Sequence, residues 1–192
     1  MMQPQFFDLQ ADPAQNFGGA GLVLGHEIFH GFDNFGRNYD SVGNLAPWWS
    51  NSSDAAFVKK AQCLVDQYGN FIARSETTGK VIGNLDGQLT LGENIGDNSG
   101  LKASFRAYQG YVKTHESKYT KETGEKLFFL SFAQSWCAKN NDAGLQSMLL
   151  DPHPPNRFRI FGALQNNFDF ARVFNCPTDT FMNPSKKCTL WE

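Results

Sequence analysis

Residues 25–30 of the chain read GHEIFH, and they lie within the longer stretch GGAGLVLGHEIFHGFD at residues 18–33. The apolar residues of this stretch predict one buried helix that carries a polar stripe. Residues four apart on a helix share a face, so His26 and His30 can direct their rings at one ion. Glu27 lies beside them, where its carboxylate can reach a water bound to that ion. The pattern is typical of a zinc site with its own general base.

The same stretch allows a plainer interpretation, in which two solvated histidines happen to share a surface helix. Leu22, Val23, Ile28 and Phe29 argue against it, because they favour burial of the helix. Buried histidines need polar partners. The zinc interpretation therefore requires a third ligand elsewhere in the chain.

The segment TLGENIGDNSG at residues 90–100 supplies a candidate ligand, within a long helix predicted over residues 90–113. Glu93 would complete a His-His-Glu set. Asp97 lies four residues further on and on the same helix face, where it can accept the second ring N–H of a ligand histidine and fix the orientation of that ring. The alternative for Asp97 is an exposed helix charge.

A zinc site with its own general base is the arrangement that metallopeptidases use. If this site hydrolyses peptides, it also needs a group that stabilises the developing oxyanion. The stretch DPHPPNRFRI at residues 151–160 offers His153 and Arg159. Single histidines and arginines near loops are usually surface features, so composition alone does not select these two. His115, the fourth histidine, lies in a polar segment and is expected to be exposed.

The rest of the chain predicts a mostly helical protein with little strand, and its 192 residues suit one large domain or two small ones. The first expected elements are an extended lead-in over residues 1–17, a helix from residue 54 that Ser53 or Asp54 caps and Gly69 ends, and a loop or short hairpin over 70–89. Two further helices are expected, one capped by Thr123 and one with Asn156 as its N-cap. The last 25 residues are expected to be loop-rich.

Composition excludes several classes of protein. The net charge is −2 and the chain has no readable basic face, so a nucleic-acid partner is not expected. Its apolar stretches are too short to span a bilayer, and the first residues lack the charged and apolar regions of a signal peptide. That absence does not decide the compartment, since a mature ectodomain would look the same.

Four cysteines lie at positions 63, 137, 176 and 188, without the C-x-x-C spacing of a zinc knuckle or a thioredoxin motif. Four cysteines allow three disulfide connectivities. Asn51-Ser52-Ser53 is a glycosylation sequon in a turn-like stretch. Together the cysteines and the sequon favour an oxidising compartment.

Five segments carry a family resemblance, and they occur in the order GHEIFHGFDNFGRNYD, TLGENIGDNSGLKASFRAYQ, LFFLSFAQSWC, DPHPPNRFRIFGALQN and MNPSKKCTLW. They resemble the C-terminal catalytic region of the neprilysin and endothelin-converting-enzyme family of zinc endopeptidases, over essentially the whole chain. The resemblance implies a mainly α, zincin-like fold of the gluzincin, thermolysin type, with little β. It also implies cleavage of oligopeptides on the amino side of hydrophobic residues, one Zn²⁺ per chain, and an extracellular or membrane-anchored ectodomain whose anchor is not in this chain.

The resemblance further assigns roles to individual residues. It implies that zinc is bound by His26, His30 and Glu93, and that Asp97 orients a ligand histidine. It also implies that Glu27 is the catalytic base, His153 stabilises the transition state and Arg159 binds a substrate carbonyl. The pocket for the hydrophobic residue after the cut would be lined by Phe6, Leu22, Val23 and Trp136. Core packing is the alternative for the last four. The family pairing implies a Cys63–Cys188 disulfide and places the partners of Cys137 and Cys176 in the upstream region, so these two are expected to be free or paired in a way that the family does not show.

Some features depart from the family pattern. Phe29 stands where the zinc motif usually has Thr, Asn34 replaces an Asp, and Gly96 and Ser99 replace Ala and Gly. Family members also carry an upstream β-sheet and lid lobe, so residues 1–192 are expected to be a single domain, the C-terminal peptidase region of a larger enzyme. The prediction is a zinc endopeptidase acting on peptides. The alternatives are a truncated zinc-binding module that is inactive without the upstream lobe, or an interaction domain with structural histidines.

Overall fold

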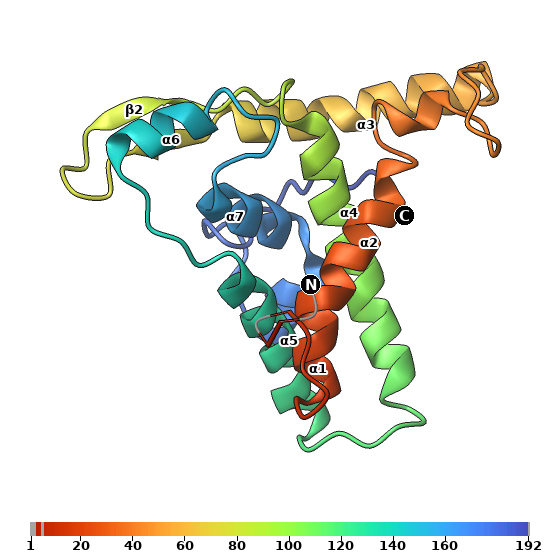
Figure 1. Ribbon diagram of the computed structural model, residues 1–192, viewed down its shortest axis with the longest axis vertical. Helices are drawn as coiled ribbons and strands as arrows, with labels where there is room; N and C mark the ends of the chain where they lie inside the picture. Colours follow the sequence, from red (N-terminus) through yellow and green to blue (C-terminus); the bar gives the residue numbers. More distant parts are fainter. Residues whose placement is uncertain (1–2, 5, 192) are drawn as a thin grey trace.

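The computed structural model describes residues 3–4 and 6–191, and it is mainly helical (Figure 1). In chain order the elements are α1 (Pro13–Asn16), the π-helical turn η1 (Phe17–Gly21), α2 (Leu22–His30), the short turn η2 (Gly36–Asn38), α3 (Asn51–Gly69), β1 (Ile72–Arg74), β2 (Val81–Asn84), α4 (Leu91–Tyr111), α5 (Lys121–Ser135), α6 (Asp142–Met148), α7 (Asn156–Asn166) and α8 (Phe168–Val173). The prediction of a mainly α fold with little strand is confirmed. No described helix has the length and apolar character that a bilayer span requires.

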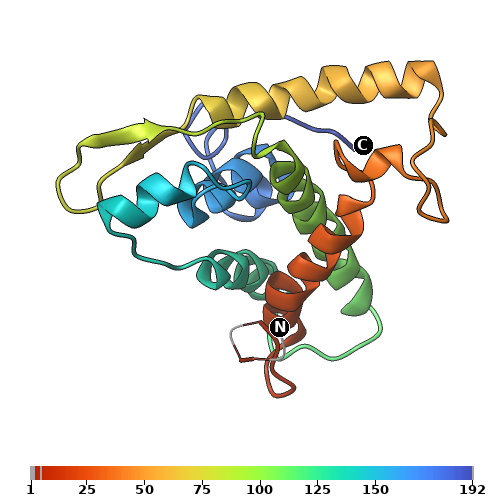
Figure 2. The ribbon, with the colours of Figure 1, turned by 45° about the horizontal axis from the view of Figure 1, so that its top comes forward.

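The two metal-motif segments lie side by side, on α2 and α4 (Figures 1 and 2). Glycines make this close approach possible. A Cβ on Gly100 of α4 would lie 2.6 Å from the backbone nitrogen of His26, and a Cβ on Gly25 of α2 would lie 3.0 Å from Cα of Gly100. The first distance is too short for any Cβ and the second is tighter than most Cβ contacts, so the two helix backbones pack directly against each other. This contact places the histidines of α2 against Glu93 and Asp97 of α4.

The start of the helical run differs from the sequence prediction. Residues 13–17 are helical rather than extended, because Asp12 forms a capping box with Gln15 and Pro13 occupies the first helical position. The chain then passes through η1 into α2 without a break. A Cβ on Gly18 would lie 2.3 Å from the carbonyl oxygen of Phe128 in α5, so this glycine serves helix packing and does not end the helix.

Three predicted helix caps were wrong, two of them by at least three residues and one by a single residue. Ser50, not Ser53 or Asp54, caps α3, and its Oγ accepts from the backbone N–H of Ser53. Thr120, not Thr123, caps α5, where its Oγ1 accepts from the backbone N–H of Thr123. The last predicted cap, Asn156, is the first residue of α7 and follows Pro155. The predicted end of α3 at Gly69 is confirmed.

Two hydrophobic clusters make up the core, and α4 contributes to both. The first joins α3 and the hairpin to the C-terminal tail, and includes Phe57, Ala61, Leu64, Tyr68, Leu91, Ile95, Phe158 and Leu190. The second joins α4 to α5, and includes Leu22, Leu101, Phe105, Tyr108, Phe128, Phe129, Phe132 and Leu164. The antiparallel hairpin β1–β2, predicted over residues 70–89, lies beside α6 (Figure 2). The helical spacing of the apolar residues in α3 and α4 therefore marks the buried faces correctly.

The disulfide expectation is also confirmed. Cys63 of α3 is bonded to Cys188 of the C-terminal tail, with a Cα–Cα distance of 5.5 Å. Cys137 and Cys176 are free thiols, the first exposed and the second half-buried. The bond holds the tail against α3, and the ring of Trp191 then lies against Phe29 of α2, at 6.5 Å between ring centroids.

Candidate active site

His26, His30 and Glu93 converge where α2 faces the first turn of α4. One ligand atom from each residue lies within 4.8 Å of the other two. Nε2 of His26 is 3.2 Å from Glu93 Oε2, and Nε2 of His30 is 3.5 Å from Glu93 Oε1. The imidazole rings are nearly perpendicular, with centroids 4.5 Å apart. The structure thus brings together the three side chains that the sequence proposed as ligands, and their role as zinc ligands stays a prediction.

Two observations indicate that the cluster of His26, His30 and Glu93 can hold a zinc ion. A tetrahedral zinc with bonds of about 2.0–2.1 Å separates its ligand atoms by roughly 3.3 Å, close to the two separations from Glu93. In addition, Glu93 Oε2 is buried without an aligned hydrogen-bond donor, although nitrogen atoms of His26, His153 and Arg159 lie within 3.5 Å of it. A carboxylate oxygen in that position suits a cation better than a neutral donor.

Asp97 is fully buried and bridges His26 to Arg159. Arg159 donates from Nε to Oδ2 and from Nη2 to Oδ1, each at 2.7 Å. Oδ1 also lies 3.0 Å from His26 Nδ1, although the approach is too oblique for a well-aligned hydrogen bond. Burial alone would raise the pKa of Asp97, but the charge of Arg159, the nearby ring of His26 and the two hydrogen bonds from Arg159 hold it below its usual value. The exposed-charge alternative for Asp97 is therefore wrong.

The imidazole of His26 is held by two carboxylates. Burial alone would lower the pKa of His26, but the carboxylates of Asp97 and Glu93, at 3.0 and 3.2 Å from its ring nitrogens, raise it to about 9. Glu93 shows the reciprocal effect, because burial opposes its ionisation while His26 and His153 lower its pKa. The site thus favours positive charge between its carboxylates, and a divalent cation would supply that charge without a proton.

Asp33 is a site residue that sequence reasoning missed. His30 donates from Nδ1 to Asp33 Oδ2 at 2.7 Å, while Asp33 Oδ1 accepts from the backbone N–H groups of Phe35 and Gly36. The carboxylate is buried and leaves Nε2 of His30 directed at Glu93. The signal was present in the sequence, since Asp33 follows His30 by three residues in HGFD.

His153 reaches the same cluster from the loop before α7. Its Nε2 lies 3.2 Å from Glu93 Oε2, and its side chain is half-exposed. Asp151 holds the opposite side of the ring, because Oδ1 faces both Nδ1 and the backbone N–H of His153 at 2.8 Å. These bonds to His153 lower the pKa of Asp151. Asp151 was likewise missed, although it stands two residues before His153 in the sequence.

The remaining predicted residues lie in different surroundings. Glu27 is exposed on α2 beside His26, and His115 is exposed, as predicted. Trp136 lies below Arg159, with Cζ of the arginine 4.0 Å from its ring centroid.

The other three pocket residues do not share one cavity in the structure. Leu22 is 1% exposed within the core, which agrees with the core-packing alternative, and Val23 is half-buried. Phe6 lines a small hollow of about 240 Å³ with Ser131 and Gln134. Their role as a substrate pocket therefore stays a prediction.

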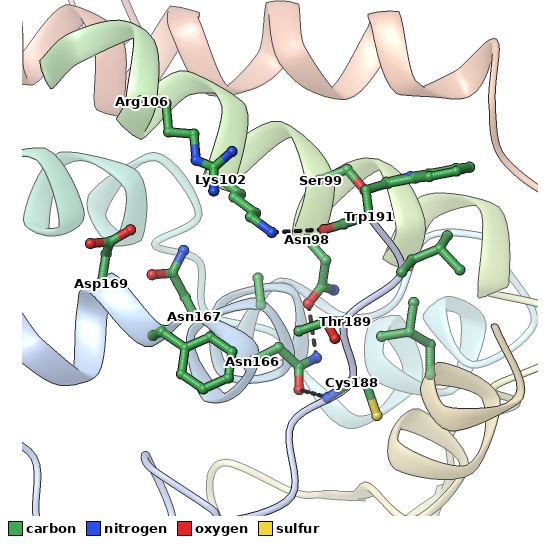
Figure 3. Close-up of a pocket in the computed structure, with 14 residues that line it drawn as sticks. Asn98, Ser99, Lys102, Arg106, Asn166, Asn167, Asp169, Cys188, Thr189 and Trp191 are labelled. Atoms are coloured by element: carbon green, nitrogen blue, oxygen red, sulfur yellow. Dashed lines mark hydrogen bonds between the residues drawn. The ribbon is translucent and has the colours of Figure 1, made fainter. Parts of the chain in front are cut away.

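A separate cavity of about 170 Å³ lies between α4, the α7–α8 junction and the C-terminal tail (Figure 3). Lys102 and Arg106 point into it from α4, and Lys102 donates to the carbonyl oxygen of Trp191. Its lining contains no histidine and none of the predicted site residues. The candidate ligands therefore lie at the α2–α4 contact and not in this cavity.

A mainly helical fold with HExxH on one helix, a glutamate ligand on the helix packed against it, and a carboxylate behind each histidine defines the zincin class of metallopeptidase. The model of peptidase family M13 matches residues 1–190. The chain therefore belongs to peptidase family M13, the neprilysin and endothelin-converting-enzyme family.

Individual relatives agree with this assignment. The chain is 44% identical to endothelin-converting enzyme 1 of Bos taurus, an alignment covering 100% of this chain and 25% of that protein. It is 44% identical to neprilysin of Oryctolagus cuniculus, covering 100% of this chain and 26% of that protein. Among solved structures, the zinc metalloprotease Zmp1 of Mycobacterium tuberculosis in complex with an inhibitor superposes with a TM-score of 0.89 at 35% identity, covering 100% of this chain and 30% of that one. The chain thus spans about a quarter of the length of the curated relatives it matches.

Proposed function

We propose that this chain is the catalytic region of a zinc-dependent endopeptidase that cleaves oligopeptides on the amino side of hydrophobic residues. The observation that carries the proposal is the convergence of His26, His30 and Glu93 at separations that suit one zinc ion per chain. Membership of peptidase family M13 supports it.

Bound zinc would polarise the scissile carbonyl and lower the pKa of a coordinated water to about 7. Glu27 adjoins a ligand histidine and faces solvent, so its carboxylate can take a proton from that water and return it to the leaving amine. His153 donates to the developing oxyanion from Nε2. The Asp151 carboxylate faces Nδ1 of the same ring at 2.8 Å and so holds Nε2 toward the cluster.

Arg159 has a more restricted role than the one the family resemblance suggests. Two of its nitrogens, Nε and Nη2, are committed to Asp97. Within residues 3–4 and 6–191, Nη1 makes no such hydrogen bond and is the donor that remains for a substrate carbonyl. Val23 and Trp136, both half-buried near the cluster, would supply apolar contacts to the residue after the cut.

The test is the Glu27→Gln variant, assayed for bound zinc and for cleavage of a short peptide with a hydrophobic residue after the cut. The variant should keep one zinc per chain and lose turnover by at least about a hundredfold, since general-base catalysis contributes about 10²–10⁴. Glu116→Gln, an exposed glutamate in the α4–α5 loop, is the matched control. Near-native cleavage by the Glu27 variant would show the mechanism to be wrong.

A second candidate is a zinc-binding module without turnover. Its support is the set of apolar side chains on and after α2 that remain exposed, among them Ile28 at 66%, Phe35 at 72% and Val42 at 78%. A peptide held only at the zinc cluster would be poorly oriented, and orientation contributes several kcal/mol to catalysis. One zinc per chain with no chelator-sensitive cleavage would favour this candidate.

The Cys63–Cys188 bond also supports an extracytoplasmic, oxidising compartment for the protein. Asn51, the acceptor of the sequon, is exposed at the first position of α3, where a glycan can be accommodated. Mass spectrometry of the protein from a secreting eukaryotic host would test both features, and a reduced Cys63–Cys188 pair there would contradict the assignment of compartment.

A further inference from the structure

Trp136 occupies the junction between the end of α5 and the start of α7. It follows Ser135, the last residue of α5, and its side chain is half-buried. The guanidinium of Arg159 lies over its ring, with Cζ 4.0 Å from the ring centroid. Arg159 is 6% exposed, so this cation is almost removed from water. Tryptophan is the best aromatic partner for a cation, and desolvation strengthens the attraction.

The edge of the same guanidinium is held by Asp97. Nε and Nη2 donate to the two carboxylate oxygens at 2.7 Å each, which is the bidentate arrangement. Two parallel hydrogen bonds of this kind form only when the guanidinium and carboxylate planes are matched. The ring of Trp136 contacts the flat face of the guanidinium, and Asp97 binds its edge. Together the two contacts fix the orientation of the guanidinium plane.

Asp97 contacts both Arg159 and His26, so the position of Arg159 affects the position of the His26 ring. Its Oδ1 accepts from Arg159 Nη2 and also lies 3.0 Å from His26 Nδ1. Asp97 is 0% exposed, so water cannot take the place of Arg159. On the far side of the imidazole, His26 Nε2 faces Glu93 at 3.2 Å. A continuous series of contacts therefore runs from Trp136 through Arg159 and Asp97 to His26.

The first turn of α7 holds Trp136 in place by a second contact. Nδ2 of Asn156 donates to the carbonyl oxygen of Trp136 at 3.2 Å. Asn156 and Arg159 are three residues apart and share one face of α7. One of them binds the backbone of Trp136 and the other its ring. If Trp136 only filled space at this junction, an aliphatic side chain would serve as well, and no aromatic ring facing Arg159 would be required.

We propose that Trp136 is a positioning residue for the zinc site: its ring holds Arg159 in the plane in which it pairs with Asp97, and so fixes the imidazole of His26. This role differs from the substrate-pocket role that the family resemblance implies, because it acts without substrate. The inference rests on the zinc site of the proposed function.

The test measures zinc affinity of the full chain by competition with a chromogenic chelator at one pH, for Trp136→Met and Trp136→Phe. Methionine keeps apolar bulk and removes the π face, and phenylalanine keeps a ring. Trp136→Met should weaken zinc binding by about 2- to 30-fold, and Trp136→Phe by less. Unchanged affinity in Trp136→Met, or an equal loss in both variants, would overturn the proposal. Trp48→Met, which alters a half-exposed tryptophan stacked on Trp49, is the control.

A double-mutant cycle separates positioning from general loss of structure. In an Arg159→Met background, Trp136→Met should cause no further loss of zinc affinity, because the residue through which it acts is gone. A second loss of the same size there would overturn the proposal. If Trp136→Met does not fold, Trp136→Tyr and Trp136→Phe decide, since zinc affinity should follow the order Trp, Tyr, Phe. Failure of the unaltered chain to bind zinc would instead refute the proposed function.

Discussion

Replacing Asp97 by asparagine removes a negative charge from the interior of the α2–α4 contact and changes the shape of the side chain very little. Asp97 is 0% exposed and accepts two hydrogen bonds from Arg159, each at 2.7 Å. Removing one partner of a buried ion pair costs about 3–5 kcal/mol, because the other charge remains buried. The asparagine oxygen keeps one acceptor, which restores about 1 kcal/mol. The expected loss in the free energy of unfolding is therefore about 2–4 kcal/mol.

Urea unfolding of the protein in excess chelator measures this loss without a contribution from zinc. For a chain of this length, 2–4 kcal/mol corresponds to a fall in Tm of about 4–16 °C. The pair of Asp169 with Arg172 offers a control, because it has similar chemistry at 3.1 Å but both side chains are at least 37% exposed. Asp169→Asn should cost less than about 1 kcal/mol.

Zinc affinity gives a second measure of the same substitution. Residues that orient a ligand histidine typically change metal affinity by about 10- to 100-fold, and Asp97→Asn should fall in that range. An Asp97→Asn protein as stable in chelator as the Asp169→Asn control would refute the argument that the buried pair holds this contact together.

Four further expectations test other parts of the site. Asp33→Asn should weaken zinc binding by about 10- to 100-fold in chelator competition. Asp151→Asn should leave that affinity unchanged and lower kcat by roughly 10- to 100-fold in a peptide-cleavage assay. Cys188→Ser, which opens a bond spanning 125 residues, should cost about 2–5 kcal/mol in urea unfolding without reductant. In chelator, the urea midpoint should fall as the pH rises from about 6.5 to 9. The pKa of His26 is raised to about 9 in the folded state, so the stability that its protonated ring contributes is complete below about pH 6.5 and is lost as the ring deprotonates. A urea midpoint that does not change over this range would contradict the expectation.

Local periodicity accounts for the part of the fold that could be predicted. Ile95, Leu101, Phe105 and Tyr108 recur at helical spacing, and all four are buried on α4. The same geometry predicted that His26 and His30 share a face, because the positions of i and i+4 side chains depend only on the helix itself.

The missed helix α1 carried a local signal, the capping box of Asp12 with Gln15, whereas the glycines that follow it show where local reasoning fails. Gly18 and Gly19 are typical of a helix break, but in the structure both lie within a continuous helical run. A Cβ at Gly18 would meet the backbone of Phe128, more than a hundred residues away in the chain. The reason for the glycine is thus a tertiary contact, which no local pattern contains.

The cap of α3 failed for a different reason. The run Ser50–Asp54 contains several residues that can cap a helix, and local propensity does not rank them. Trp49 packs against Phe57 and Trp191, and this contact fixes the direction in which the chain enters the helix. Ser50 follows directly, so the partly buried Trp49 places it at the start of the helix, where its Oγ accepts from the backbone N–H of Ser53.

Charge balance explains why the carboxylates behind the histidines belong to the site as much as the ligands do. Three carboxylates, Asp33, Glu93 and Asp97, contact the imidazoles of His26 and His30, and among the described residues Arg159 is the permanent cation that pairs with them. With neutral imidazoles, the cluster carries two net negative charges in a largely buried setting, which is costly unless compensated. One divalent cation neutralises it. Arg159 lies 62 residues from Asp97 in the sequence, so this balance could be found only in the folded chain.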